Sequence, residues 1–157
     1  MLRWYLTPWR TWYHHIDDDK KTRWQRFACR VARLLPNPYL HCFLRDDDDR
    51  ALHDHPSCAV SLMLSSGYIE HTIDAGGIHR RRLIEAGAIR LMPTRHAHRI
   101  ELERATPSGL PVPCWTLFMF GPVVREWGFH CPEQGWIHWR KFTAAGKPGE
   151  IGPGCDA

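Results

Sequence analysis

The sequence predicts a mainly β protein, a sandwich or barrel of short strands with one helix before it. Three observations lead to this fold class. The chain has 157 residues, of which 43% are hydrophobic and 24% charged, and these values suit one globular domain. After Pro38, short extended segments alternate with turns rich in Gly, Pro and Asp. Before Pro38, residues 18–35 show the three- and four-residue repeat of apolar side chains that is typical of a helix.

The N-terminal part, residues 1–38, is predicted to be an aromatic arm followed by this helix. Residues 1–16 are rich in Trp and Tyr, and Pro8 argues against a continuous helix, so we expect an extended arm whose rings pack on the domain. In residues 18–35 the basic side chains lie mostly outside the apolar face, an Asp of the run 17–19 can cap the start, and Pro36 ends the helix. We therefore expect an amphipathic helix that packs on the β structure.

Residues 39–142 are predicted to form the β domain itself. Its turns are marked by features such as the acidic run 46–49, Gly67, Gly87 and Gly121-Pro122. The expected strands are 39–45, 50–56, 59–65, 67–73, 78–84, 86–92, 97–103, 114–120, 123–129 and 136–142. Many short strands at close spacing predict a sandwich or barrel. Residues 143–157 are rich in Gly and Pro and are predicted to be a flexible tail.

Other features argue against several classes of protein. No apolar stretch approaches the roughly 18 residues of a membrane-spanning helix, and the first residues do not resemble a secretory signal. Because the six cysteines form no Cys-x-x-Cys pair, we expect reduced thiols in a cytoplasmic protein. The net charge of +4 suits a small anionic ligand, and we expect neither nucleic acid nor a membrane as a partner. The sequence also lacks a phosphate-binding loop and a nucleophile elbow.

Two histidine pairs carry the sharpest chemical signal. His53 and His55 flank Asp54 in a predicted strand, and residues two apart on a strand point to the same face. About forty residues later, His96 and His98 form a second pair. One ligand from the second pair would complete a site with three protein ligands and open positions, which is the catalytic type of metal site.

These two runs resemble the two sequence motifs of the cupin superfamily. His53-Asp54-His55-Pro56 followed by Gly67 is similar to the first motif, and Gly87, Pro93 and His98 are similar to the second. The resemblance covers roughly residues 39–142 and implies a double-stranded β-helix, or jelly-roll barrel. It also implies a metal held by His53, His55 and His98.

The sequence departs from the cupin pattern at three places. Ala59 and Val60 stand where the first motif has a metal-binding glutamate, and Arg95 and Leu102 stand where the second has glycine and asparagine. Two interpretations of the missing carboxylate stay open. The site resembles a three-histidine iron site, as in the cysteine-dioxygenase branch, or Glu70 supplies the carboxylate from the next strand.

Strand parity alone does not decide the position of Glu70. Tyr68 and Glu70 share one face and Ile69 and His71 the other, so an apolar core would send Glu70 outward, whereas a polar barrel interior would reverse the assignment. Whether Glu70, His71 or His96 joins the site therefore stays open at this point. We consider Glu70 and Tyr68 the candidate catalytic residues.

The resemblance implies a mononuclear metal enzyme, with an oxygenase or dioxygenase as the first hypothesis. Fe(II) is the first candidate metal, and Zn, Ni and Mn also suit imidazole ligands. Arg90 and Arg95 are candidates for binding an anionic group of a small substrate. The main alternative is a metal-independent isomerase or epimerase, with His53 or His55 as base and Tyr68 as acid.

A third hypothesis is a binding or assembly protein without catalysis. The stretches 53–71 and 124–129 are similar to small uncharacterised cupins of tailed bacteriophages and prophages. In that setting the aromatic arm, the basic helix and the tail would contact a partner. We also expect a homodimer, formed through the arm or an edge strand.

Overall fold

A computed structural model of the chain describes residues 2–5, 22–24, 26–27, 37–47, 51–144 and 151–156, with only the backbone for residues 2–5 and Asn37. Its strands are β1 (Leu2–Tyr5), β2 (Asn37–Phe43), β3 (Leu52–His53), β4 (Ala59–Ser65), β5 (Tyr68–Asp74), β6 (Ile78–Ile84), β7 (Ile89–Met92), β8 (Arg99–Leu102), β9 (Cys114–Phe120), β10 (Gly128–Cys131) and β11 (Gly135–His138). Two short helices follow, α3 (Trp139–Phe142) and the 3-10 helix η2 (Gly154–Asp156).

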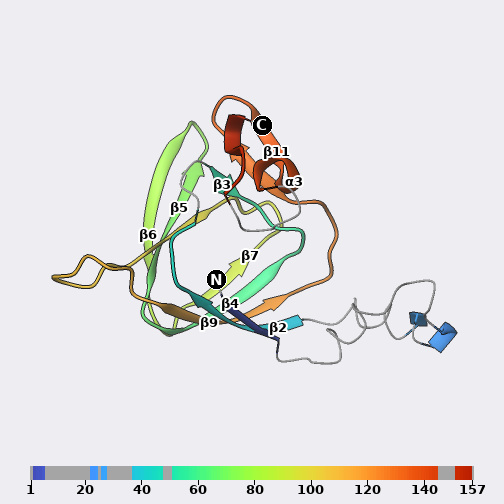
Figure 1. Cartoon of the computed structure of the whole chain (residues 1–157), viewed down its shortest axis with the longest axis horizontal. Coiled ribbons are helices and arrows are strands. Elements are labelled where there is room, and N and C mark those ends of the chain that lie inside the picture. The colour runs from blue at the N-terminus through green and yellow to red at the C-terminus, as the bar shows by residue number, and fades with distance from the viewer. Residues whose placement is uncertain are drawn as a thin grey trace.

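The strands form two facing antiparallel layers. One layer is a five-stranded sheet in the order β1-β2-β9-β4-β7. The other consists of two three-stranded sheets, β11-β10-β3 and β6-β5-β8, which an antiparallel bridge between His53 and His98 joins edge to edge. The layers curve around a common interior (Figure 1). The orders β2-β9-β4-β7 and β3-β8-β5-β6 are those of a jelly roll, so the prediction of a mainly β jelly-roll architecture is confirmed.

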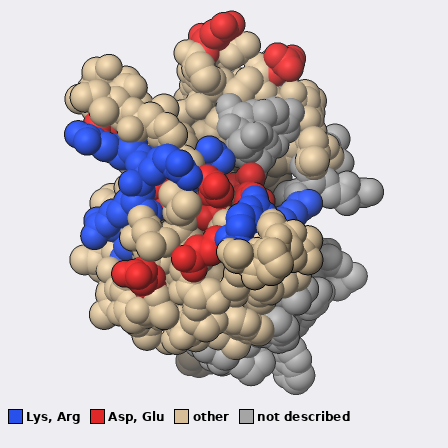
Figure 2. Space-filling view, turned by 90° about the vertical axis from the view of Figure 1, so that its left-hand side faces the viewer, with Lys and Arg blue, Asp and Glu red and all other residues tan. Residues whose placement is uncertain are grey.

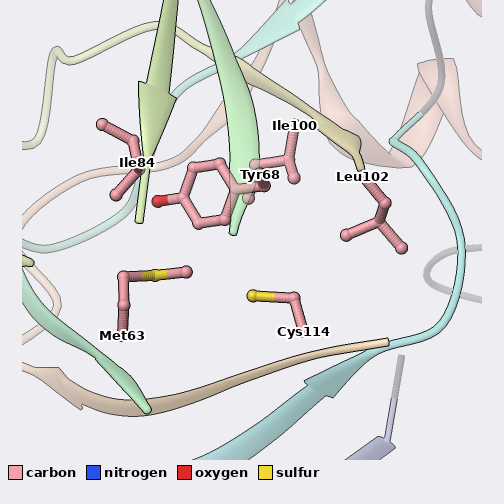
Figure 3. Packing of buried hydrophobic residues seen from close by; sticks show 6 residues of the cluster. All are labelled: Met63, Tyr68, Ile84, Ile100, Leu102 and Cys114. Carbon is pink, nitrogen blue, oxygen red and sulfur yellow. The ribbon is translucent and has the colours of Figure 1, made fainter. Parts of the chain in front are cut away.

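The core follows from the alternation of side chains along these strands. Met63 of β4 and Cys114 of β9 point inward from the five-stranded sheet, and Tyr68 and Leu102 meet them from the opposite layer. Figure 3 shows these side chains, together with those of Ile84 and Ile100, packed toward one another between the strands. Farther along the same sheet, Ala59, Met92 and Phe118 form a second buried cluster. Both apolar clusters thus line the interior, which also contains the polar groups described below.

The outer face of the five-stranded sheet is also apolar. Its cross-strand register gives two rows without a charged residue, Pro38-Met119-Val60-Leu91 and Leu40-Leu117-Leu62-Ile89. We call these two rows the outer apolar face. It is most exposed at the edge strand β7, where Leu91 is 71% and Ile89 is 68% exposed.

Of the expected strands, 50–56 is reduced to β3 (Leu52–His53), and two others differ more strongly from the observed elements. Instead of a strand over 123–129, the chain forms a loop that is held by hydrogen bonds from the amides of Val124 and Arg125 to the carbonyl oxygen of Pro56, and β10 begins at Gly128. Instead of a strand over 136–142, β11 ends at His138, whose side chain caps α3 by accepting a hydrogen bond from the Arg140 amide at 3.2 Å. In the first place a tertiary contact, and in the second a local hydrogen bond, redirects a chain that is rich in strand-forming residues.

The predicted N-terminal helix lies largely outside the described residues. Arg23, Trp24, Arg26 and Phe27 are helical and follow Thr22, and the rest of 18–35 is not described. Trp24 and Phe27, which belong to the predicted apolar face, are 80% and 59% exposed and contact each other edge to face. The packing of this helix on the barrel stays a prediction. No helix among the described residues has the length and apolar character needed to span a membrane.

The C-terminal segment returns to the barrel. Cys155 of η2 forms a disulfide with Cys131 of β10, and Ile151 forms an isolated bridge with Thr143. The expectation that all cysteines are reduced thiols is therefore wrong for this pair. The sequence spacing of 24 residues could not indicate the pairing, because only the return of the chain after Thr143 brings Cys155 to β10.

Candidate metal centre

Three imidazoles converge where the two layers join. His53 ends β3, His55 follows it, and His98 immediately precedes β8. The backbones of His53 and His98 are bonded in both directions, with N–O distances of 2.8 and 3.0 Å. The ring centroids form a nearly equilateral triangle, with separations of 4.8 Å (His53–His98), 5.0 Å (His55–His98) and 5.2 Å (His53–His55). One ring nitrogen from each of the three could reach a common metal ion.

The chemistry of these donors fits a divalent metal. Burial, helped by the neighbouring imidazoles, lowers the pKa of His53 to about 3 and that of His55 to about 2. At neutral pH both rings are therefore uncharged and carry a free lone pair, as metal ligands must. The Nε2 atoms of His55 and His98 lie 2.9 Å apart. Two ligands at right angles around an ion, each about 2.1 Å from it, lie about 3.0 Å apart.

Glu70 lies inside the barrel beside these histidines. It is 2% exposed and shares the inner face of β5 with Tyr68, whereas Ile69 is half-buried on the other face. Its Oε1 atom lies 3.0 Å from His98 Nδ1 and 2.8 Å from His96 Nε2, and its Oε2 atom accepts a hydrogen bond from Arg90. Burial alone would raise the pKa of Glu70, but the hydrogen bonds from His96, His98 and Arg90 outweigh it and hold the pKa well below its usual range. The polar-interior interpretation of strand parity is thus the one that the structure shows.

Glu70 also belongs to a second set of donors. Glu70, His96 and His98 present ligand atoms close enough together for one ion, and this set shares His98 with the first. The two sets use different atoms of His98, because Nε2 faces His55 and Nδ1 faces Glu70. His98 is therefore the central residue of the whole cluster.

Asp54 anchors the segment that carries His53 and His55, on the side away from the imidazoles. It is 1% exposed and points away from the imidazoles, as expected from its parity between His53 and His55. Its carboxylate accepts hydrogen bonds from Arg125 Nη1 at 2.7 Å, the Gly128 amide at 2.9 Å and Trp136 Nε1 at 3.1 Å. Burial would raise the pKa of Asp54, but the hydrogen bonds from Arg125, the Gly128 amide and His130 lower it below its ordinary value. The segment is thus fixed to β10 and β11.

Asp47 is a residue near the site that sequence reasoning missed. Its Oδ2 atom lies 3.7 Å from His53 Nδ1 and accepts a hydrogen bond from the Ile100 amide at 2.8 Å. Burial raises the pKa of its carboxyl group. The acidic run 46–49 indicated only a turn, and nothing in it indicated that Asp47 approaches His53.

The other candidate residues lie in different surroundings. Tyr68 packs in the apolar cluster of Figure 3, and burial raises the pKa of its hydroxyl group. Arg90 reaches into the interior, where it pairs with Glu70, whereas Arg95 is exposed. His71 lies on the face of β5 opposite Glu70. There it contacts Glu101 at 2.7 Å and His79 at 2.9 Å.

The outer side of β5 and β6 is basic with acidic residues interspersed. Figure 2 shows this side of the molecule, where Lys and Arg side chains gather in a band around acidic ones. Arg80 pairs with Asp74 and Arg81 with Glu101, and all three arginines of the run 80–82 are exposed. Such solvated pairs contribute little stability.

Comparisons with known proteins give similarities of fold. No protein-family model and no curated protein sequence matches the chain. Among solved structures, the chain is similar to a cupin-2 domain-containing protein from Shewanella frigidimarina, with 10% identity, a TM-score of 0.40, and coverage of 55% of this chain and 70% of that one. It is also similar to a cupin superfamily protein from Desulfitobacterium hafniense, with 13% identity, a TM-score of 0.39, and coverage of 55% and 67%.

The chain is also similar in structure to part of a larger protein. Oxalate decarboxylase from Bacillus subtilis is 13% identical with a TM-score of 0.45, and the match covers 73% of this chain but only 26% of the decarboxylase. At these identities the likeness concerns the fold alone. The solved structures to which this chain is similar thus include cupin proteins, the superfamily that its two histidine motifs resemble.

Proposed function

We propose that the protein binds a single divalent metal ion through His53, His55 and His98 and acts as a non-haem iron oxygenase or dioxygenase on a small anionic substrate. The convergence of His53, His55 and His98 on one point, with His55 and His98 buried, carries this proposal. Fe(II) is the first candidate ion, and Zn, Ni and Mn are the alternatives that imidazole ligands allow. When bound, the metal would supply Lewis acidity and, if it is iron, one-electron chemistry with dioxygen.

The chain's own residues would shape the site around the ion. Phe120 lies 6.1 Å from the ring of His55 and contacts Phe118, so an aromatic wall limits water on this side. Arg90 is already paired with Glu70 inside the barrel. Arg95 is exposed and has no ion-pair partner among the residues that the structure describes, so it is the better placed of the two to meet a substrate anion.

Metal content after anaerobic purification and reconstitution with Fe(II) tests the proposal. We expect one ion per chain in the wild type and loss of that ion in His53→Ala and His98→Ala. His79→Ala, which removes an exposed imidazole on β6, is the matched control and should keep the metal. Equal metal content in all four proteins would remove the proposal. Activity that survives complete chelation would favour the metal-independent isomerase instead.

We also propose that two copies of the chain pair through the outer apolar face. Its rows carry no charged residue, so a second copy can approach without bringing like charges together, although the chain has a net charge of +4. Its most exposed residues lie on the edge strand β7, as expected of a surface that a partner covers. Light scattering should report a dimer for the wild type and a monomer for Leu91→Lys. Ile78→Lys, at an exposed apolar residue on β6, should remain dimeric, and a monomeric wild type would contradict the proposal.

A further inference from the structure

We infer that Glu70 is a positioning residue that holds the proton of His98 on Nδ1 and thereby presents the lone pair of Nε2 to the ion shared with His53 and His55. This inference rests on the proposed metal centre and deepens it. It assigns an indirect role to a buried carboxylate that contacts His98 inside the barrel, at a site where the first sequence motif lacks its usual glutamate.

The hydrogen bond between Glu70 and His98 fixes which nitrogen carries the proton. The Nδ1 atom of His98 lies 3.0 Å from Glu70 Oε1. Because an ionised carboxylate can only accept, the hydrogen atom of this bond belongs to Nδ1. A neutral imidazole then has its lone pair on Nε2, the atom that lies 2.9 Å from His55 Nε2. A carboxylate that orients a metal-binding histidine through its other nitrogen is a common arrangement, and it raises the basicity of the ligand.

The remaining partners of Glu70 hold the carboxylate in this role. His96 Nε2 lies 2.8 Å from the same oxygen, and Arg90 bonds to the other one. Both oxygens of a side chain that is 2% exposed are thus occupied by donors. Arg90 comes from the opposite layer, where β7 pairs with β4, so the ion pair also ties the two layers together at the site.

The rival arrangement places the ion among Glu70, His96 and His98. It needs the lone pair of His98 on Nδ1, so the bond to Glu70 would be replaced by a shared ion. It also places a divalent cation next to the Arg90 guanidinium in a buried site, which electrostatic repulsion opposes. Finally, it leaves His53 and His55 without a ligand role. An ion bound by His53, His55 and His98 has none of these costs.

Two measurements test the inference with Co²⁺ as the probe. Long-range ¹H–¹⁵N NMR of the metal-free wild type should show His98 protonated on Nδ1, and a ring protonated on Nε2 would overturn the inference. Titration with Co²⁺, followed by its visible absorption, should show binding in Glu70→Ala that is weaker by about 10–100-fold but still one ion per chain. Glu70→Gln keeps an acceptor oxygen at the same place and should recover most of this affinity with the wild-type spectrum.

The variants separate the possible outcomes. If Glu70→Ala and His96→Ala both lose the ion while His53→Ala keeps it, the rival set holds the metal and the inference is wrong. If Glu70→Ala binds Co²⁺ as tightly as the wild type, Glu70 does not position His98, and the metal centre itself still stands. If the wild type binds no Co²⁺, the proposed function fails. Thermal melting of each variant shows whether it is folded, and the NMR measurement on the wild type decides the inference if Glu70→Ala does not fold.

Discussion

Replacing Asp54 with Ala should destabilise the protein strongly, although the residue contacts no predicted ligand through its side chain. The change removes the acceptor for the Gly128 amide and the Trp136 indole, which lie 2.9 and 3.1 Å from the carboxylate. Leaving a buried donor such as the Gly128 amide unsatisfied costs about 1–3 kcal/mol, whereas the Trp136 side chain is 41% exposed and loses less. Arg125 loses its buried partner as well, but its side chain is 30% exposed and is partly rehydrated. We therefore expect the free energy of unfolding to fall by about 3–5 kcal/mol.

Urea denaturation at pH 7 measures this loss, with Asp74→Ala as the control. Asp74 pairs with Arg80 on the surface, with both side chains more than half exposed, so its removal should cost less than about 1 kcal/mol. The pKa of Asp54 is lowered by its hydrogen bonds despite burial, so its contribution is complete above the unfolded pKa of about 3.9 and is lost as the pH falls through the folded value. The difference between wild type and Asp54→Ala should narrow below about pH 4. A loss of less than about 1 kcal/mol at pH 7 would refute the reasoning.

Three further predictions concern packing, the disulfide and the metal. Gly128→Ala should lower the free energy of unfolding by about 3 kcal/mol in denaturant melts, because a Cβ there would collide with the Ile137 carbonyl oxygen and the Trp136 ring. Gly121→Ala is the control: its Cβ would lie 3.0 Å from the Cys58 Sγ atom and 3.4 Å from the Cys58 carbonyl oxygen, so the change should cost less than about 1 kcal/mol. Cys131→Ser should cost about 3.5 kcal/mol by the chain entropy of a loop with a 24-residue separation, and dithiothreitol should lower the melting temperature of the wild type but not of this variant. Co²⁺ at a hundred times its dissociation constant should stabilise the wild type by about 2.7 kcal/mol and leave His53→Ala unchanged in thermal melts.

Much of the fold could be predicted because alternation and turn residues agree along the chain. The strands 59–65, 78–84 and 114–120 have the predicted boundaries, each lying between turn-forming residues. The prediction fails where tertiary contacts override local preference. Val123 and Val124 favour a strand, yet they are 75% and 71% exposed in a loop held by the carbonyl oxygen of Pro56.

Only those features of the candidate site that follow from the alternation of side chains along a strand could be predicted. The two-residue spacing of His53 and His55 indicated a shared direction, and their rings do lie together. The position of Glu70 was not decidable, because its partners Arg90 and His96 are 20 and 26 residues away and no local pattern shows a polar interior. The donors to Asp54 lie farther still, at separations of 71 to 82 residues. Contacts of this range exist only once the barrel has closed.

The reciprocal amide bonds of His53 and His98 have a consequence for the dynamics of the layer that contains them. They form the seam at which the sheets β11-β10-β3 and β6-β5-β8 become continuous, and the same two residues supply predicted ligands. Any opening that parts these sheets must separate the ligands, so an ion bound by both residues would oppose the opening. Binding of the ion and closure of the seam are then thermodynamically linked. Binding of the ion should therefore slow amide exchange at His53 and His98 more than at the distant edge strand β7.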